Sequence, residues 1–272
     1  MTDPRGWADI GMPLPRSAPP QPGTPASRTG IWKRAFRLVR WGVALALAWL
    51  LVAAPPPLWY WVAFPRETAF MAMRAESPDA RQDGVDYRPV RLDQVAPVMR
   101  RAVLVAEDNR FYDHGGFDWV EVRRALGYPR DDFDAGNPRH RRDLRRALER
   151  TWAGQGRLRG ASTITQQVAK NLYLSPSRNP LRKAKEAVLA KRLEWALSKD
   201  RILELYLNIA EFGPGVWGVE AASQTYFRKP ASRLTRVEAA ALAATLPFPL
   251  LSNPAYRPAR MRARQAVILR RL

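Results

Sequence analysis

The pattern of apolar and polar positions divides the chain into three parts. Residues 1–30 contain seven prolines and few large apolar side chains. Such a segment cannot offset the entropy of ordering, so residues 1–35 are predicted to form a disordered tail. A run of 24 residues without a charge follows, from Trp41 to Phe64. From residue 65 to residue 272, apolar positions recur at the spacing of helices.

The charge-free run is long enough to cross a bilayer as a helix. Three consecutive prolines interrupt it, so we expect the regular helix at Phe36–Ala54 and the whole anchor at residues 36–64. The aromatic side chains Trp59, Tyr60 and Trp61 crowd its far end, which is typical of a membrane interface. A cleaved signal peptide usually lies nearer the N-terminus and is shorter, and a buried core helix seldom carries such a run. A single transmembrane anchor is therefore favoured over both alternatives.

The basic residues around this run predict its orientation. Five lie just before it, between Arg28 and Arg40, and three lie just after it, at Arg66, Arg74 and Arg81. Because basic residues are enriched on the cytoplasmic side, the N-terminus is expected in the cytoplasm and residues 65–272 outside it.

The exported part is predicted to be mainly helical. Helical spacing marks four segments: Leu92–Asp108, Ser162–Leu174, Pro180–Leu207 and Val237–Leu246. We expect the third to break near Ser198–Asp200. Arg139–Arg150 holds six arginines and is expected to be a solvated loop or a short helix. Phe70, Met71 and Met73 either dip among lipids or pack into the core.

Composition excludes several kinds of site. The chain has no cysteine, so disulfides, thiolate metal sites and thiol nucleophiles are impossible. Two histidines cannot form an all-histidine zinc site. The net charge is +20, and the region beyond residue 64 is basic in its own right, with 38 basic and 23 acidic residues. This charge indicates an anionic partner: a nucleic acid, a membrane surface or a phosphorylated substrate.

Common catalytic motifs are missing. The chain has no G-x-x-x-x-G-K-[ST] loop, no G-x-G-x-x-G, no H-E-x-x-H and no G-x-S-x-G. The sequence therefore gives no support for nucleotide hydrolysis, dinucleotide redox chemistry, zinc proteolysis or α/β-hydrolase chemistry. Carboxylates, amides and cations remain as candidate functional groups.

A first cluster runs from Glu107 to Gly116. Glu107 and Asp108 end an apolar helix, where the helix dipole disfavours negative charge. Partial burial would raise a carboxyl pKa in the same direction, toward that of a useful general base. The alternative is a polar turn broken by two glycines.

A second cluster runs from Gly160 to Asn171. Thr163 and Gln166 have the spacing of a capping box, so a helix should begin here. A helix N-terminus followed by Lys170 suits phosphate or sugar hydroxyls. The alternative is an ordinary amphipathic helix with a good cap.

Two further clusters follow. Arg182 and Glu186 are four residues apart, so an intrahelical salt bridge is one interpretation. The other is a cationic pyrophosphate site that includes Lys183 and holds the carboxylate inside it. Ile202–Asn208 and the glycine turn after it are typical of structural roles when taken alone.

In their order and spacing, the clusters resemble the glycosyltransferase domain shared by class A penicillin-binding proteins and monofunctional biosynthetic peptidoglycan transglycosylases. The pattern E-D-x-x-F-x-x-H-x-G is matched by Glu107, Asp108, Phe111, His114 and Gly116. The pattern G-x-S-T-I-T-Q-Q-x-x-K-N is matched by Gly160–Asn171. The patterns R-K-x-x-E and I-L-E-x-Y-L-N are matched by Arg182, Lys183 and Glu186, and by Ile202–Asn208.

The resemblance implies a mainly α fold: a bilobal, lysozyme-like glycosyltransferase domain at residues 65–272, preceded by a single N-terminal transmembrane helix in a bacterial inner membrane. It implies a peptidoglycan polymerase that elongates glycan chains from lipid II with inversion, forms β-1,4 links and releases undecaprenyl pyrophosphate. The implied partners are the growing glycan-lipid, the membrane and cell-wall synthesis or division proteins, with no nucleic acid. No cofactor is obligatory and no metal ligand set is expected, although a divalent cation stimulates relatives.

The resemblance also assigns roles to residues. The acceptor hydroxyl needs a base, which is Glu107, and the departing pyrophosphate needs cations, which Lys170, Arg182 and Lys183 supply. Glu186 orients those cations or helps the leaving group. The positions expected to bind substrate also include Asp108, Phe111, His114, Ser162, Gln166, Gln167 and Asn171.

Two rival functions and two departures from the family pattern remain, and the first departure is Ala161, which stands where many relatives have a second glycine. A lysozyme-like hydrolase or lytic transglycosylase would also use a glutamate at a helix end, but it needs no cationic cluster. A nucleic-acid-binding membrane protein would explain the basic charge, but the expected topology places the domain outside the cytoplasm. Gly127–Leu158 is longer and richer in arginine than is usual in the family, so its conformation is left open.

Overall fold

The computed structural model describes residues 36–45, 48, 57–76, 84–152, 162–174 and 180–272. The chain divides into two units, Met1–Trp49 and Leu50–Leu272. In the first unit, residues 36–45 are helical, within the predicted anchor. Among the described residues, no helix combines the length and apolar character needed to cross a membrane. The predicted tail 1–35 and anchor residues 46–47 and 49–56 lie outside the described residues.

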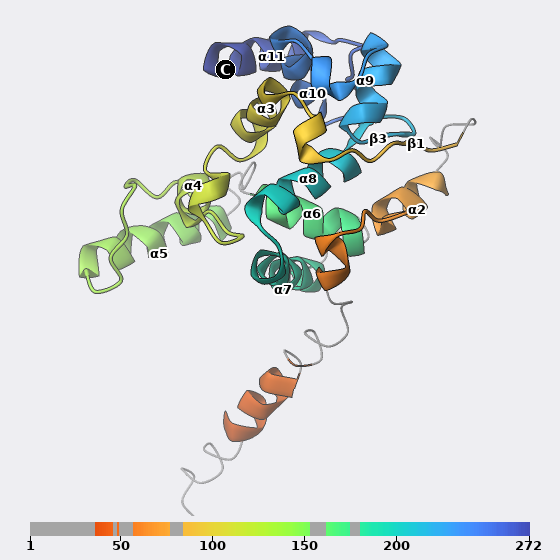
Figure 1. Ribbon diagram of the computed structural model, residues 1–272. Coiled ribbons are helices and arrows are strands. Elements are labelled where there is room, and N and C mark those ends of the chain that lie inside the picture. Colours follow the sequence, from red (N-terminus) through yellow and green to blue (C-terminus); the bar gives the residue numbers. More distant parts are fainter. Residues whose placement is uncertain (1–35, 46–47, 49–56, 77–83, 153–161, 175–179) are drawn as a thin grey trace, which may run out of the picture. The chain divides into compact units, whose positions relative to one another are not determined.

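The second unit is mainly helical, as predicted (Figure 1). Its α-helices are α2 (Ala69–Ala75), α3 (Pro97–Glu107), α4 (Trp119–Ala125), α5 (Pro138–Trp152), α6 (Ile164–Tyr173), α7 (Pro180–Ala196), α8 (Lys199–Ile209), α9 (Val219–Phe227), α10 (Arg236–Thr245) and α11 (Ala259–Arg271). Its 3₁₀ turns are η1 (Pro57–Trp61), η2 (Leu92–Gln94), η3 (Phe111–Asp113) and η4 (Ala231–Arg233). Its strands are β1 (Asp86–Tyr87), β2 (Glu211–Gly213) and β3 (Val216–Trp217).

Side-chain caps set the helix starts that the sequence predicted. The Thr163 hydroxyl accepts a hydrogen bond from Gln166 N, and the Gln166 side chain accepts one from Thr163 N, so the capping box of α6 is confirmed. Ser198 caps α8, which confirms the break between α7 and α8. The first predicted helix is shorter than expected: α3 begins at Pro97, after the separate turn η2.

The arginine-rich segment differs from the prediction of a loop or short helix. It forms α5, a helix of 15 residues. The Asn137 side chain accepts a hydrogen bond from Arg139 N at its start, and His140 and Ala147, seven residues apart, are buried on one side. Because most positions of this segment are charged, its few buried positions do not stand out as a helical pattern in the sequence.

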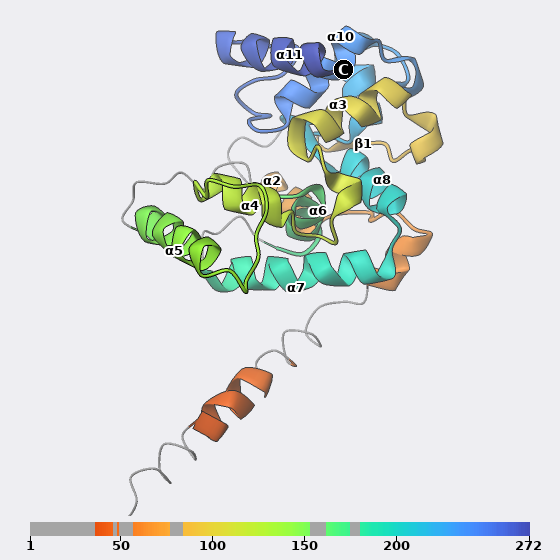
Figure 2. The same ribbon diagram turned by 90° about the vertical axis from the view of Figure 1, so that its left-hand side faces the viewer.

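The helices form two groups joined by α8. α3, α10 and α11 pack on one another, and α6 packs against α2, α7 and α8. In both views, α11 lies at the upper edge and α7 at the lower edge of residues 57–272 (Figures 1 and 2). A continuous hydrophobic core runs through both groups.

A small sheet, in the order β1-β3-β2, lies beside α9. β1 is parallel and β2 antiparallel to β3. The chain turns from β3 into α9 at Gly218, with φ at +84°. A Cβ atom there would lie 2.5 Å from Asn208 O, so only glycine fits.

The end of the predicted anchor, residues 57–64, belongs to the second unit and packs on its helices. Arg201 Nε donates to Tyr60 O at 2.6 Å, and its Nη2 donates to Ala63 O at 2.8 Å. η1 also contacts α7. The predicted boundary between the anchor and the domain, at residue 64, therefore divides residues 57–64 from the helices α7 and α8 that they contact. Of the residues expected either among lipids or in the core, Met71 is buried and Phe70 packs edge-on against Trp217.

Candidate active site

Glu107 is the last residue of α3, and its carboxylate is held from two sides. Gln167 Nε2, on α6, donates to Glu107 Oε2 at 2.9 Å. Arg264 Nη2, on α11, donates to Glu107 Oε1 at 2.8 Å and to Ala106 O at 2.9 Å. The Glu107 side chain is only 12% exposed, so its orientation is fixed before any ligand binds.

The pKa of Glu107 reflects this setting. Burial raises the pKa above the usual value of a glutamate. The hydrogen bond from Gln167 and the positive charge of Arg264 oppose that rise. The predicted direction is confirmed, and burial is its main cause.

Two residues that support Glu107 were not among the predicted site residues. Arg264 is 157 positions away from Glu107 along the chain. It is one of several arginines in α11, and nothing in the local sequence distinguishes it from the others. Tyr206 Oη donates to Gln167 Oε1 at 3.1 Å, which orients the amide so that its nitrogen faces Glu107. Tyr206 lies in the matched I-L-E-x-Y-L-N pattern, so a signal for it was present.

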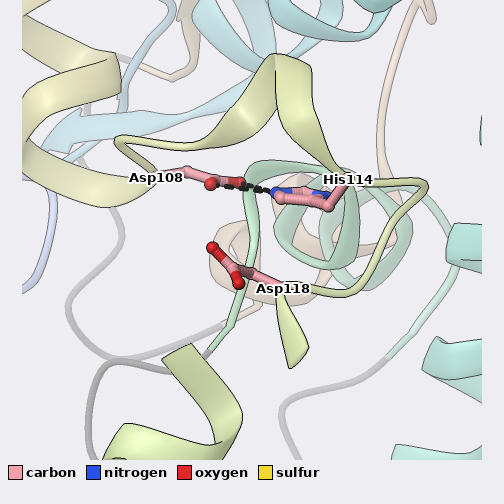
Figure 3. A group of neighbouring side chains, drawn as sticks. All are labelled: Asp108, His114 and Asp118. Atoms are coloured by element: carbon pink, nitrogen blue, oxygen red, sulfur yellow. Dashed lines mark hydrogen bonds and ion pairs between the residues drawn. The ribbon is translucent and has the colours of Figure 1, made fainter. Parts of the chain in front are cut away.

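Asp108 and His114 form a buried pair beside Glu107 (Figure 3). His114 Nε2 lies 3.0 and 3.1 Å from the two oxygens of Asp108. Ile164 N, the first backbone amide of α6, donates to Asp108 Oδ2 at 2.9 Å. The pair therefore ties the end of α3 to the start of α6, and places the carboxylate at a helix N-terminus.

Asp108, His114 and Asp118 each offer a potential ligand atom, and these atoms lie within 4.8 Å of one another (Figure 3). Gly116 N donates to His114 Nδ1 at 3.3 Å, which assigns the imidazole proton to Nε2, facing Asp108. A cation would need the Nε2 lone pair. Asp118 Oδ1 is engaged as the N-cap of α4, and its Oδ2, which makes no hydrogen bond within the described residues, faces the Arg110 guanidinium at 3.7 Å. A cation would therefore have to displace the His114 proton and compete with Arg110, so the trio fits a hydrogen-bonded support better than a cation site.

The predicted site residues of α6 differ in their burial and in their contacts. Gln166 is buried and its oxygen is used by the capping box. Asn171 is also buried, and its Oδ1 has no hydrogen-bond partner among the described residues. Lys170 lies over the Phe70 ring, with 5.7 Å between its Nζ and the ring centroid.

A carboxylate with two cations lies at the start of α7. Glu186 is buried and accepts a hydrogen bond from Arg182 Nη1 at 2.8 Å. Its other oxygen is paired with Lys183 Nζ, which also lies 3.3 Å from Ser162 Oγ. The predicted salt bridge between Arg182 and Glu186 is thus present, and Lys183 joins it.

Lys170 connects this cluster with Glu107 electrostatically. Burial lowers the pKa of Lys170, whereas the negative charges of Glu186 and Glu107 raise it. The cations Arg182 and Lys183 act with burial to lower it. Two buried carboxylates, Glu107 and Glu186, and three cations therefore lie within electrostatic reach of one another, which suits a reaction that moves a proton and releases an anion.

At Glu107 the site opens into a cavity of about 200 Å³, whose lining does not include Lys170, Arg182, Lys183 or Glu186. Its lining includes Glu107, Asp108, Ser162 and Thr163. Phe111, expected to contact substrate, instead lies in the core under the Lys199 ammonium, which is 4.3 Å from the ring centroid.

Comparisons with known proteins identify a family and named relatives. The chain matches the family model described as transglycosylase over residues 76–130 and 140–272. Proteins named biosynthetic peptidoglycan transglycosylase from Shigella sonnei (strain Ss046) and Escherichia coli (strain K12 / DH10B) are each 48% identical to it over 183 residues. The alignment covers 67% of this chain and 66% of each relative, just under two thirds of their length.

Proposed function

This chain belongs to the transglycosylase family, and we propose that it is a peptidoglycan glycosyltransferase that elongates glycan chains from lipid II. The acceptor hydroxyl attacks the anomeric carbon of the donor with inversion, forms a β-1,4 link and displaces undecaprenyl pyrophosphate. The name of the 48% identical relatives supports this activity. The observation that carries it is the geometry of Glu107, a buried carboxylate with a raised pKa at a cavity.

Glu107 is proposed as the general base. A sugar hydroxyl is a weak nucleophile, so attack requires a group that takes its proton. Gln167 and Arg264 each occupy one oxygen of the carboxylate and leave further lone pairs for the acceptor hydroxyl. Because its pKa is raised, the Glu107 carboxylate is a stronger base than an ordinary glutamate, as a general base requires.

Lys170, Arg182 and Lys183 are proposed to stabilise the departing pyrophosphate. Negative charge develops on the leaving group in the transition state, and fixed cations in a partly buried site stabilise it strongly. Glu186 holds Arg182 and Lys183 in place, so the cations are positioned before the substrate arrives. Glu186 is not required as an acid, because a pyrophosphate leaves without protonation.

The remaining predicted residues are proposed to shape the site. Ser162 and Asn171 contact sugar or phosphate, since one is exposed at the cavity and the other has a buried unpartnered oxygen among the described residues. Asp108 and His114 position the base by tying α3 to α6. We further propose that the two helix groups are the two lobes of a lysozyme-like fold.

The protein is proposed to work at the bacterial inner membrane, with its N-terminus in the cytoplasm and the catalytic domain outside it. The lipid chain of the substrate cannot leave the bilayer, so the site must operate at its surface. The apolar run 41–64 and the exposed Trp59 and Trp61 support this location. Partners are then the growing glycan-lipid and cell-wall synthesis or division proteins, without nucleic acid or an obligatory cofactor.

The rival hydrolase would shorten glycan chains instead of lengthening them. Its leaving group is a sugar hydroxyl, for which the cationic cluster around Glu186 has no use. The cluster therefore favours the transferase.

The test is incubation of the purified full chain in detergent with labelled lipid II, and separately with preformed glycan, followed by gel analysis. We expect long glycan products from lipid II and no shortening of the glycan. Shortened glycan, or unchanged lipid II with a folded protein, would reject the proposal.

A further inference from the structure

The solvent side of α5 carries a row of arginines. Arg139, Arg142 and Arg146 are spaced three and four residues apart, which places them on one face of the helix. All three are exposed, whereas His140 and Ala147 are buried on a different face. α5 therefore presents a basic stripe, defined here as Arg139, Arg142 and Arg146.

The acids near the stripe do not neutralise it. Asp143 pairs with Arg130 at 3.2 Å, and Glu149 pairs with Arg145 at 2.8 Å. Within the part of the chain that the structure describes, the three stripe side chains make no ion pair and no side-chain hydrogen bond. Their charges are thus available to a ligand.

The chemistry and length of the stripe point to rows of phosphates. A guanidinium binds phosphate oxygens through two parallel hydrogen bonds. Residues seven apart on a helix are separated by about 10 Å along its axis, which exceeds a single pyrophosphate and suits several headgroups side by side. Anionic phospholipids attract each such arginine near the surface.

α5, the helix that carries the stripe, also lies toward the edge of the domain where η1 exposes its tryptophans. α5 and α7 lie along the same lower edge of residues 57–272 in both views (Figures 1 and 2). η1 packs against α7 and exposes Trp59 and Trp61, at 72% and 66%. Basic and apolar groups at one edge are the combination that binds an anionic membrane surface.

We propose that the basic stripe of α5 docks on anionic phospholipid headgroups and holds the domain against the membrane independently of the anchor. The inference rests on the proposed function only in that the substrate lies in a membrane. Of the stripe residues, Arg139 lies outside the matched family segments, and Arg142 and Arg146 lie within them.

The chain has no cysteine, so one introduced cysteine carries a fluorescent label at a single place. Glu149→Cys puts the label beside the stripe, and Ala266→Cys puts it on exposed α11 at the opposite edge. The full chain is reconstituted in vesicles of phosphatidylglycerol and phosphatidylcholine, or of phosphatidylcholine alone, with a quencher on the lipid headgroup. Inorganic pyrophosphate is added in a separate arm without vesicles.

We expect quenching at position 149, and not at 266, in anionic vesicles at low salt. Quenching should be lost at about 1 M salt, where the Debye length is about 3 Å. Replacing the three stripe arginines by Gln should weaken docking about a hundredfold. The control replaces three exposed arginines elsewhere, Arg233, Arg262 and Arg270, by Gln; it removes the same charge and should leave docking intact.

Equal quenching in neutral vesicles, or quenching that survives the loss of the stripe, would overturn the proposal. A response to pyrophosphate alone would overturn it in favour of a phosphate site. Polymerisation of lipid II in detergent is measured on the same variants. Because that assay contains no bilayer, its failure would reject the proposed function and not the docking surface.

Discussion

Glu107 is a residue of α3, but side chains of two other helices also control its carboxylate. Its two oxygens accept hydrogen bonds from Gln167 of α6 and Arg264 of α11. Burial alone would push the carboxylate toward protonation, and these two donors keep it able to ionise. Under the proposed role of Glu107 as the base, the balance between burial and donors at this residue sets the pH range of the reaction.

Glu107→Gln tests the base directly. The change is nearly isosteric and removes the basic group, so we expect a loss of about 10²- to 10⁴-fold in lipid II polymerisation. Circular dichroism and thermal melting should remain close to those of the parent protein. A folded Glu107→Gln protein with near-parent turnover would remove Glu107 from the role of base.

Arg264→Gln tests the control of that base. Arg264 lowers the pKa of Glu107, so its removal should raise that pKa further. The base form is lost as pH falls through the pKa, so the acid limb of the rate against pH should move to higher pH. The matched control is Arg262→Gln, an exposed arginine of the same helix. An unmoved acid limb in Arg264→Gln would show that Arg264 has only a structural role.

At the scale of elements, the start of α6 is the junction of the site. Thr163 caps the helix, and its hydroxyl donates to Gly116 O at 2.8 Å, which fixes the loop that carries His114. Asp108 receives the next backbone amide. One turn of helix therefore aligns the loop after α3 with the polar residues of α6.

Thr163→Ala should disturb this junction. It removes a helix cap worth about 1 kcal/mol and a buried hydrogen bond worth about 1 kcal/mol more, so we expect a loss of about 2 kcal/mol in the free energy of unfolding. Chemical denaturation measures this loss. Thr163→Ser keeps both interactions and serves as the control; equal destabilisation of the two variants would place the effect in the methyl group.

Elements set by local sequence were predictable, and those set by distant contacts were less so. The cap at Thr163 and the break at Ser198 depend on residues three positions apart, so the sequence contains the whole signal. α5 depends on a narrow buried face supported by Asn137 and was missed as a long helix. The pairing of Arg264 with Glu107 bridges 157 positions and leaves no local pattern.

At the scale of the whole molecule, charge and apolar surface are distributed unevenly. The run from Trp41 to Phe64 within the predicted anchor is free of charge, and the domain beyond residue 64 carries 15 more basic than acidic residues. η1 adds exposed apolar side chains to a segment that packs on the domain through Tyr60 and Arg201. The membrane contact proposed for this enzyme is therefore built partly into the folded domain.

Replacing both Trp59 and Trp61 by Ser tests the apolar part of that contact. Tyr60 packs against the core between them and is unchanged, so the domain should fold normally. Interfacial tryptophans favour the headgroup region, so their loss should reduce polymerisation several-fold for lipid II in vesicles and leave the rate in detergent unchanged. Tyr256→Ser, which removes another exposed aromatic, is the control. If the double variant is equally impaired in detergent, the tryptophans act on folding or catalysis; if it is unimpaired in vesicles, η1 is not a membrane contact.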